Sequence, residues 1–328
     1  MVILILVIVV LFFLWLLFFV NPPQAKKITW GVNFSQMQAE TLGLDWKKTY
    51  LAILEDLGAK HIKLLPQWDW VEGKKGEFYF KDTDWQVAEA QSHGANLIYV
   101  LGMKTGRWPE CHVPSWAESL SKQSQQQEIL AYIKEVVLRY KDNKAIVAWQ
   151  AENEPLFKFG ECPWYDSDFL EKEVGLIKSL DPTRPVIVSD SGEQSLWFGA
   201  ANVGDIVGTT MYRRVWVRIV GNYGFYIDFP LPPMSYWLKA QLVKAFFGKK
   251  VINVELQAEP WGPEALYNMP LQEQEKTMSL GQFNANVSYA KKTGFDEFYF
   301  WGTEWWYWLR EKHNQPQIWN AAKEVFQK

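Results

Sequence analysis

Two glutamates stand where apolar runs end, and a pair of carboxyl groups can do acid, base and nucleophilic chemistry. Residues 149–155 read WQAENEP and residues 251–261 read VINVELQAEPW, which puts Glu154 and Glu255 after strand-like segments. A protonated carboxyl can donate a proton to a leaving group while an ionised one attacks the reacting carbon. If the two lie close together, the charge of one raises the pKa of the other. The alternative is that they are two of 37 acidic residues in solvated loops.

Glu152 and Glu259 are close enough in sequence to be mistaken for this pair. Glu152 would share a face with Glu154 if the strand continued, because strand side chains alternate with a period of two. We rank both as loop or subsite residues, because Pro155 fixes the register of the first segment and Glu255 directly follows a β-branched run.

The rest of the chain alternates short apolar runs with longer segments of helical period, which is typical of repeated βα units. Helices are predicted at residues 46–57, with Asp45 as cap and Gly58 as stop, and at 125–140. An open doubly wound sheet would alternate similarly, but no GxGxxG turn follows the first strand. We therefore expect an α/β protein with one (β/α)8 barrel over residues 28–328. The predicted strands are 28–34, 61–65, 96–101, 146–151, 186–189, 206–211, 251–254 and 297–301.

A barrel of this kind carries its active site on the loops after the C-terminal ends of the strands. Polar, acidic and aromatic residues gather directly after the predicted strands, at 67–70, 104–112, 152–155, 212–214, 255–261 and 301–308. The sequence therefore places the candidate chemistry at one end of the barrel.

Asn153-Glu154-Pro155 after the fourth strand, with Glu255 at the end of the seventh, resembles glycoside hydrolase clan A. The resemblance implies a TIM barrel that cleaves β-glycosidic bonds with retention. Glu154 would be the general acid/base, Glu255 the nucleophile, and Asn153 would contact the sugar 2-hydroxyl. Retention requires the two carboxyls to lie about 5–5.5 Å apart.

Five further positions bear on that resemblance. Tyr212 matches the tyrosine that hydrogen-bonds the nucleophile, and Trp301 matches the aromatic platform beneath the sugar. Lys63 stands where clan members carry an arginine, which keeps the charge but loses the planar fork. Gly102 and Thr210 stand where the cellulase-like group of family 5 tends to have histidines, so family 5 itself is the less secure part of the prediction.

Several loop residues are predicted to position the substrate, with packing or surface roles as the alternative. They are Trp68, Arg107, Trp108, Glu110, His112, Trp164 and Trp261.

The N-terminal segment, residues 1–27, is predicted to be a membrane anchor, with a cleaved signal as the alternative. Residues 2–20 form an unbroken apolar run of 19, which would span the bilayer as one transmembrane helix. Lys26 and Lys27 favour a cytoplasmic domain by the positive-inside rule. Cys111 and Cys162 lie in predicted loops at one end of the barrel, and a disulfide between them favours a domain outside the cytosol. We expect a membrane-anchored extracytoplasmic domain, or a secreted one.

The segment from residue 216 to 247 is long and apolar. We interpret it as a loop after the sixth strand that packs on its own barrel, with a lid or a membrane contact as alternatives.

Composition argues against other classes of protein. The net charge of −3 and the scattered basic residues give no footprint for nucleic acid. Four histidines without an HExxH pattern argue against a metal site, and no cofactor motif or GxSxG elbow is present. The 19 Trp, 14 Tyr and 20 Phe suit a carbohydrate partner but also a core.

Two functions remain, and we expect a monomer for both. One is a hydrolase, or a transglycosylase that uses the same covalent intermediate. The other is a barrel that binds glycans without turning them over.

Overall fold

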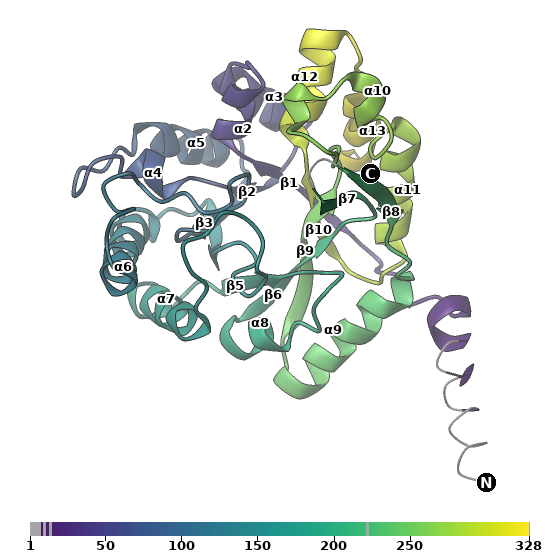
Figure 1. Ribbon diagram of the computed structural model, residues 1–328, viewed down its shortest axis with the longest axis horizontal. Helices are drawn as coiled ribbons and strands as arrows, with labels where there is room; N and C mark the ends of the chain where they lie inside the picture. The colour runs from purple at the N-terminus through teal and green to yellow at the C-terminus, as the bar shows by residue number, and fades with distance from the viewer. Residues whose placement is uncertain (1–7, 9–10, 13–14, 221–222, 328) are drawn as a thin grey trace.

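The fold is a closed barrel of eight parallel strands surrounded by helices (Figure 1). The computed structural model describes residues 8, 11–12, 15–220 and 223–327. The barrel strands are β1 (Thr29–Phe34), β2 (His61–Leu64), β3 (Asn96–Leu101), β4 (Ile146–Ala151), β5 (Val186–Asp190), β6 (Ile206–Met211), β9 (Lys250–Gln257) and β10 (Glu297–Trp301). Each pairs with its sequence neighbour in the barrel, and β10 closes on β1. The predicted (β/α)8 barrel is confirmed.

The helices alternate with the strands and cover the outside of the barrel (Figure 1). They are α2 (Gln36–Thr41), α3 (Trp46–Glu55), α4 (Trp68–Val71), α5 (Lys81–Ser92), α6 (Lys122–Tyr140), α7 (Ser167–Leu180), α8 (Phe198–Val203), α9 (Pro233–Phe247), the 3-10 turn η1 (Leu266–Asn268), α10 (Leu271–Gln274), α11 (Leu280–Lys291), α12 (Thr303–His313) and α13 (Gln317–Phe326). Local chemistry sets the ends of α3: the Asp45 carboxylate accepts from the first-turn amides of Lys47 and Lys48, each at 3.1 Å. Gly58, at φ +74°, reverses the chain towards β2.

The barrel interior is apolar in its lower layers and polar near the C-terminal ends of the strands. Ile98, Ile187 and Val254 fill the centre in one buried cluster with their neighbours. Above them, Asn33 donates to the backbone oxygens of Val254 and Phe300, at 2.9 and 3.1 Å. The larger core lies between the strands and the helices. This packing holds the strand ends at fixed positions, which is what a site built from several strands requires.

The segment 216–247 is not the single long loop that the sequence suggested. Strands β7 (Arg214–Val220) and β8 (Tyr223–Asp228) form an antiparallel hairpin, and α9 follows as a regular barrel helix against β9. Trp216 and Tyr226 face one another across the hairpin, with ring centroids 4.9 Å apart. The expectation of a loop was wrong because the apolar residues of the hairpin and of the helix follow one another without a clear polar break.

The predicted membrane segment, residues 2–20, lies largely outside the described residues. Among the residues that the structure does describe, no helix combines the length and the apolar character needed to cross a bilayer. The anchor therefore stays a prediction.

The predicted disulfide joins the loops after β3 and β4. Cys111 and Cys162 are bonded, with Cα atoms 5.2 Å apart and a sequence separation of 51. The bridge ties the loop that carries Arg107 to the segment that follows Glu154.

Removing this bridge should lower the stability of the domain. We expect the double variant Cys111→Ser/Cys162→Ser to lose about 2–4 kcal/mol of unfolding free energy, because the unfolded chain is no longer constrained by a closed loop. Urea unfolding with and without reductant measures this, and reductant should leave the double variant unchanged. Alkylation of both thiols in unfolded, unreduced wild type would contradict the bond.

Candidate active site

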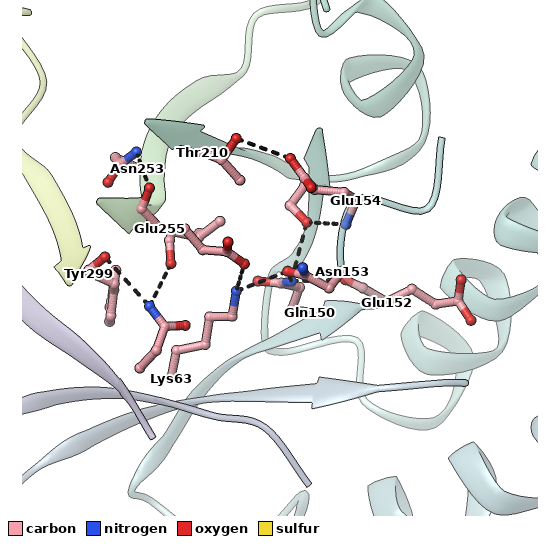
Figure 2. Close-up of polar contacts among 12 residues, drawn as sticks. Lys63, Gln150, Glu152, Asn153, Glu154, Thr210, Asn253, Glu255 and Tyr299 are labelled. Carbon is pink, nitrogen blue, oxygen red and sulfur yellow. Dashed lines mark hydrogen bonds and ion pairs between the residues drawn. The ribbon is translucent and has the colours of Figure 1, made fainter. Parts of the chain in front are cut away.

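Glu154 and Glu255 lie at the C-terminal end of the barrel, and Thr210 lies beside both. Thr210 on β6 is the register partner of Glu255 on β9, and its hydroxyl donates to Glu154 Oε1 at 3.0 Å. Neighbouring strands lie about 4.8 Å apart. Both glutamates are buried and face the same region (Figure 2). The two carboxyls that the sequence singled out are therefore brought together.

The backbone bends sharply after β4, at the segment that carries Glu154. Glu152 and Glu154 both have positive φ, at 54° and 46°, a conformation that non-glycine residues rarely adopt and that often marks functional sites. The Ser189 hydroxyl on β5 accepts from the Glu154 backbone N–H at 2.8 Å and fixes the bend. Sequence reasoning missed Ser189.

Lys63, on β2, links the two halves of the site. Its ammonium donates to Asn153 Oδ1 at 3.1 Å and to Glu255 Oε1 at 3.2 Å. Burial lowers the pKa of Lys63, and the negative charge of Glu255 opposes that shift. A lysine can therefore make the contacts that the position requires, although it replaces the arginine of the clan pattern.

Tyr212 holds the other oxygen of Glu255. Its hydroxyl donates to Glu255 Oε2 at 2.8 Å, as the resemblance implied. Burial, and then the charge of Glu255, raise the pKa of Tyr212 well above its usual value, so the hydroxyl keeps its proton. Glu193, which the sequence did not reveal, accepts from the Tyr212 backbone N–H at 2.7 Å and from Tyr236 at 2.6 Å.

The electrostatics give the two glutamates different roles. Burial, and next the negative charge of Glu255, raise the pKa of Glu154 well above the usual range of a glutamate. Glu255 instead accepts from two donors, the Lys63 ammonium and the Tyr212 hydroxyl. Glu154 is therefore suited to donate a proton and Glu255 to act as a nucleophile.

Arg107 is buried against Trp301, the residue predicted to be the sugar platform. Its guanidinium pairs with Glu259 and, at 2.8 Å, with Glu304, and it stacks on the Trp301 ring at 4.2 Å. Burial opposes the charged form, but the two carboxylates outweigh it and raise the pKa of Arg107. Arg107 therefore supports the platform, and Glu259 is occupied as its partner.

Two of the residues predicted to bind substrate are part of the core. Trp68 is fully buried against Trp116 and Tyr132. His112 is also buried, and its Nε2 bonds the backbone oxygens of Gly106 and Arg107, at 3.0 and 3.2 Å. Both side chains pack within the protein, so their predicted contact with a substrate stays a prediction.

Aromatic rings lie near each other around this end of the barrel. Trp108 is largely exposed, and Phe159 lies between it and Trp261, with ring centroids 6.2 and 5.6 Å away. Trp261 also contacts Tyr212 edge to face at 5.3 Å. The sequence analysis predicted that Trp108 and Trp261 position the substrate, whereas it did not single out Phe159. Such a row offers flat apolar faces to sugar rings.

Glu152 points away from the catalytic pair (Figure 2). Its carboxyl accepts from the backbone N–H groups of Met103 and Lys104, at 3.1 and 3.3 Å. A Cβ on Gly102 would lie 2.7 Å from Glu152 Cγ and 3.1 Å from Glu173 Oε1, and the φ of +102° disfavours any residue with a side chain. A histidine here, as in the family 5 pattern, would require these glutamates to shift and the backbone to be strained.

Replacing Glu173 with Gln should change how stability depends on pH. Burial, and then Glu152, raise the pKa of Glu173 well above normal, so above the unfolded pKa of about 4.3 the folded state must retain a proton that the unfolded state releases. Wild-type stability therefore falls as pH rises. We expect Glu173→Gln to have the higher Tm at pH 8, with the advantage lost near pH 4. A Tm difference that does not change with pH would contradict this.

Replacing Thr210 tests its contact with Glu154. Thr210→Val removes the hydroxyl and keeps the shape, so kcat/KM on an aryl β-glycoside should fall on the order of tenfold, equivalent to about 1.4 kcal/mol. Thr210→Ser keeps the donor and should lose less. Equal losses in the two variants, at unchanged Tm, would show that packing and not the hydrogen bond matters.

Comparisons with known proteins agree with this geometry. A family model, glycosyl hydrolase family 10, matches residues 65–226, which include Glu154 but end before Glu255. A probable mannan endo-1,4-beta-mannosidase F of Aspergillus flavus is 31% identical over 142 residues, covering 37% of this chain and 29% of the relative. A probable mannan endo-1,4-beta-mannosidase A of Aspergillus niger is 36% identical over 123 residues, covering 33% of this chain and 30% of the relative. The matched part spans less than a third of these relatives.

Solved structures share the fold at low identity. A family 10 endo-beta-1,4-xylanase of Gloeophyllum trabeum has a TM-score of 0.58 at 15% identity, covering 92% of this chain and 97% of its own. A family 5, subfamily 18 protein of Bifidobacterium longum subsp. infantis has a TM-score of 0.60 at 14% identity, and the match covers 92% of this chain and 79% of that protein. The chain is thus similar in sequence to glycoside hydrolases over part of its length and shares their barrel fold. Family 5 in particular is not confirmed, since the matching family model is that of family 10.

Proposed function

We propose that this domain hydrolyses β-glycosidic bonds in a β-linked polysaccharide, with retention and through a covalent glycosyl-enzyme intermediate. The observation that carries the proposal is the pair of buried carboxyls, Glu154 and Glu255, that face the same region at the C-terminal end of the barrel, with Thr210 beside both (Figure 2). One is kept protonated by burial and by the charge of the other. This is the division of roles that retaining hydrolysis needs.

In the first step Glu255 attacks the anomeric carbon as Glu154 gives its proton to the departing oxygen. The Lys63 ammonium and the Tyr212 hydroxyl orient the attacking carboxylate. The glycosidic C–O bond breaks, an ester bond to Glu255 forms, and the aglycone leaves as an alcohol.

In the second step Glu154 acts as the base. The ester has neutralised Glu255, so the charge that raised the pKa of Glu154 is gone and the carboxylate can accept a proton. Water attacks the anomeric carbon, its proton passes to Glu154, and Glu255 is released. If a sugar hydroxyl replaced water, the same site would be a transglycosylase.

A β-1,4-linked backbone such as mannan is the first substrate to test. The named relatives are mannan endo-1,4-beta-mannosidases, and the family model belongs to a glycoside hydrolase family. The Trp301 platform and the exposed ring of Trp108 support binding of successive sugar rings. The Cys111–Cys162 bridge supports a location outside the cytosol.

Single substitutions of the glutamates test the mechanism. We expect Glu154→Gln to lose on the order of 10²–10⁴-fold in kcat on mannan, and Glu255→Gln to lose at least as much. On a 2,4-dinitrophenyl β-glycoside, whose leaving group needs no proton, Glu154→Gln should keep far more of its glycosylation rate than Glu255→Gln. Stopped-flow release of the phenol measures this, with a 2-fluoro glycoside to trap the adduct on Glu255 by mass spectrometry.

The matched control is Glu118→Gln, an exposed glutamate that should retain wild-type activity. Full activity in Glu154→Gln or Glu255→Gln would overturn the assignment. Binding of glycans without turnover in wild type, across mannan, xylan and glucan, would favour the alternative of a non-catalytic glycan-binding barrel.

A further inference from the structure

Two buried carboxyl groups, those of Glu152 and Glu173, take no part in the proposed mechanism. Glu152 points away from the catalytic pair (Figure 2). Glu173, on α7, is 1% exposed, and both of its carboxyl oxygens are sealed inside the protein without a hydrogen-bond partner among the described residues. Such surroundings disfavour an ionised carboxylate, whereas a neutral carboxyl needs only one acceptor for its O–H.

The carboxyl of Glu152 lies beside that of Glu173, at Gly102. A Cβ on Gly102 would lie 3.0 Å from Glu152 Oε1 and 3.1 Å from Glu173 Oε1. The two oxygens therefore border the same small space, which the missing side chain of Gly102 leaves open. Glu152 is thus the acceptor at hand for a proton on Glu173.

The hydrogen-bond donors are on the side of Glu152. Its Oε1 accepts from the backbone N–H groups of Met103 and Lys104, at 3.1 and 3.3 Å. Burial raises the pKa of Glu152 to about 7, against the effect of these amides and of the Lys104 charge. Burial, and then the charge of Glu152, raise the pKa of Glu173 well above its usual value. Around α7, the charged groups that act on the pair are Glu152 itself, after β4, and Lys104, after β3.

Glu152 lies at the start of the bend that carries Glu154. Its φ is 54°, a conformation that persists in a non-glycine residue only when its surroundings hold it. The loops after β3 and β4 provide this hold: the Glu152 N–H donates to the Leu101 oxygen at 2.8 Å, and the Asn153 N–H donates to the Lys104 oxygen. The Lys104 ammonium donates to the Glu154 backbone oxygen at 2.9 Å. Repulsion at the Glu152 carboxyl would therefore act directly on these contacts.

We propose that Glu173 is a positioning residue, whose protonated carboxyl donates to the Glu152 carboxylate and thereby holds the bend that carries Asn153 and Glu154. The inference goes beyond the proposed hydrolase function, on which its kinetic test rests, because it adds a proton that the reaction never uses. When this proton passes to solvent at high pH, two buried carboxylates repel each other at Gly102 and the bend loosens.

The kinetic test uses the full chain and 2,4-dinitrophenyl β-mannoside, whose leaving group needs no proton from Glu154. The kcat/KM of wild type should fall from pH 7.5 to pH 10 as the shared proton is lost. Glu173→Gln keeps a donor in its amide and does not titrate, so its fall should be smaller on the order of tenfold, because small displacements of groups that contact the substrate are costly. Lys63 and Tyr212 are common to both proteins, so the difference between the profiles belongs to the carboxyl pair.

Two further variants complete the test. Glu173→Leu removes the donor as well as the charge, and should lose more kcat/KM at pH 7.5 than Glu173→Gln. Glu171→Gln, an exposed glutamate on the same helix, is the control and should keep the wild-type profile. Parallel profiles of wild type and Glu173→Gln at unchanged Tm would overturn the proposal, and this comparison decides even if Glu173→Leu does not fold.

Infrared difference spectra separate this proposal from the hydrolase function, because they need no turnover. Wild type minus Glu173→Gln at pH 7.5 should show the C=O band of a protonated, buried carboxyl, and wild type minus Glu171→Gln should not. Absence of the band would overturn the shared proton even in an active enzyme. Its presence in a protein that cleaves no glycoside would support the carboxyl pair and overturn the hydrolase function instead.

Discussion

Two carboxyl groups held close together in a buried place repel each other, and the site depends on relieving that repulsion by a proton on one of them. The barrel provides different surroundings for the two. Glu255 receives donors from Lys63 and Tyr212, whereas Glu154 receives a single hydroxyl from Thr210. Burial then makes the neutral form of Glu154 the stable one. The two glutamates therefore differ in their hydrogen-bond donors, and the proposed roles of acid and nucleophile rest on that difference.

The chain reaches this arrangement with substitutions in the pattern that it resembles. Lys63 replaces a planar guanidinium with a point charge that still contacts both halves of the site. Thr210 takes a histidine position and bonds Glu154 directly. Gly102 stands at the second histidine position of that pattern, and its lack of a side chain leaves room for the carboxyls of Glu152 and Glu173. The contacts around the glutamates are therefore built from other residue types, consistent with fold-level likeness at low sequence identity.

Sequence patterns predicted the framework better than the surroundings of the site. The strand runs were clear because each is a short apolar segment between helical ones, and they carried Glu154, Glu255 and Tyr212 to the correct barrel end. The burial of Trp68 and His112 was not predicted, because a residue near a strand end can turn inwards or outwards. Ser189 and Glu193 were missed because their contacts come from distant strands. The β7–β8 hairpin was missed because residues in both the hairpin and α9 are apolar.

The N-terminal segment joins the barrel at the end opposite the catalytic glutamates. Pro23 lies beside Gly294, which precedes β10, and β1 begins at Thr29 on the same side. A surface, bead or fusion partner attached ahead of Thr29 would therefore sit beneath the barrel floor. The end of the barrel that carries Glu154 and Glu255 would then face away from the attachment.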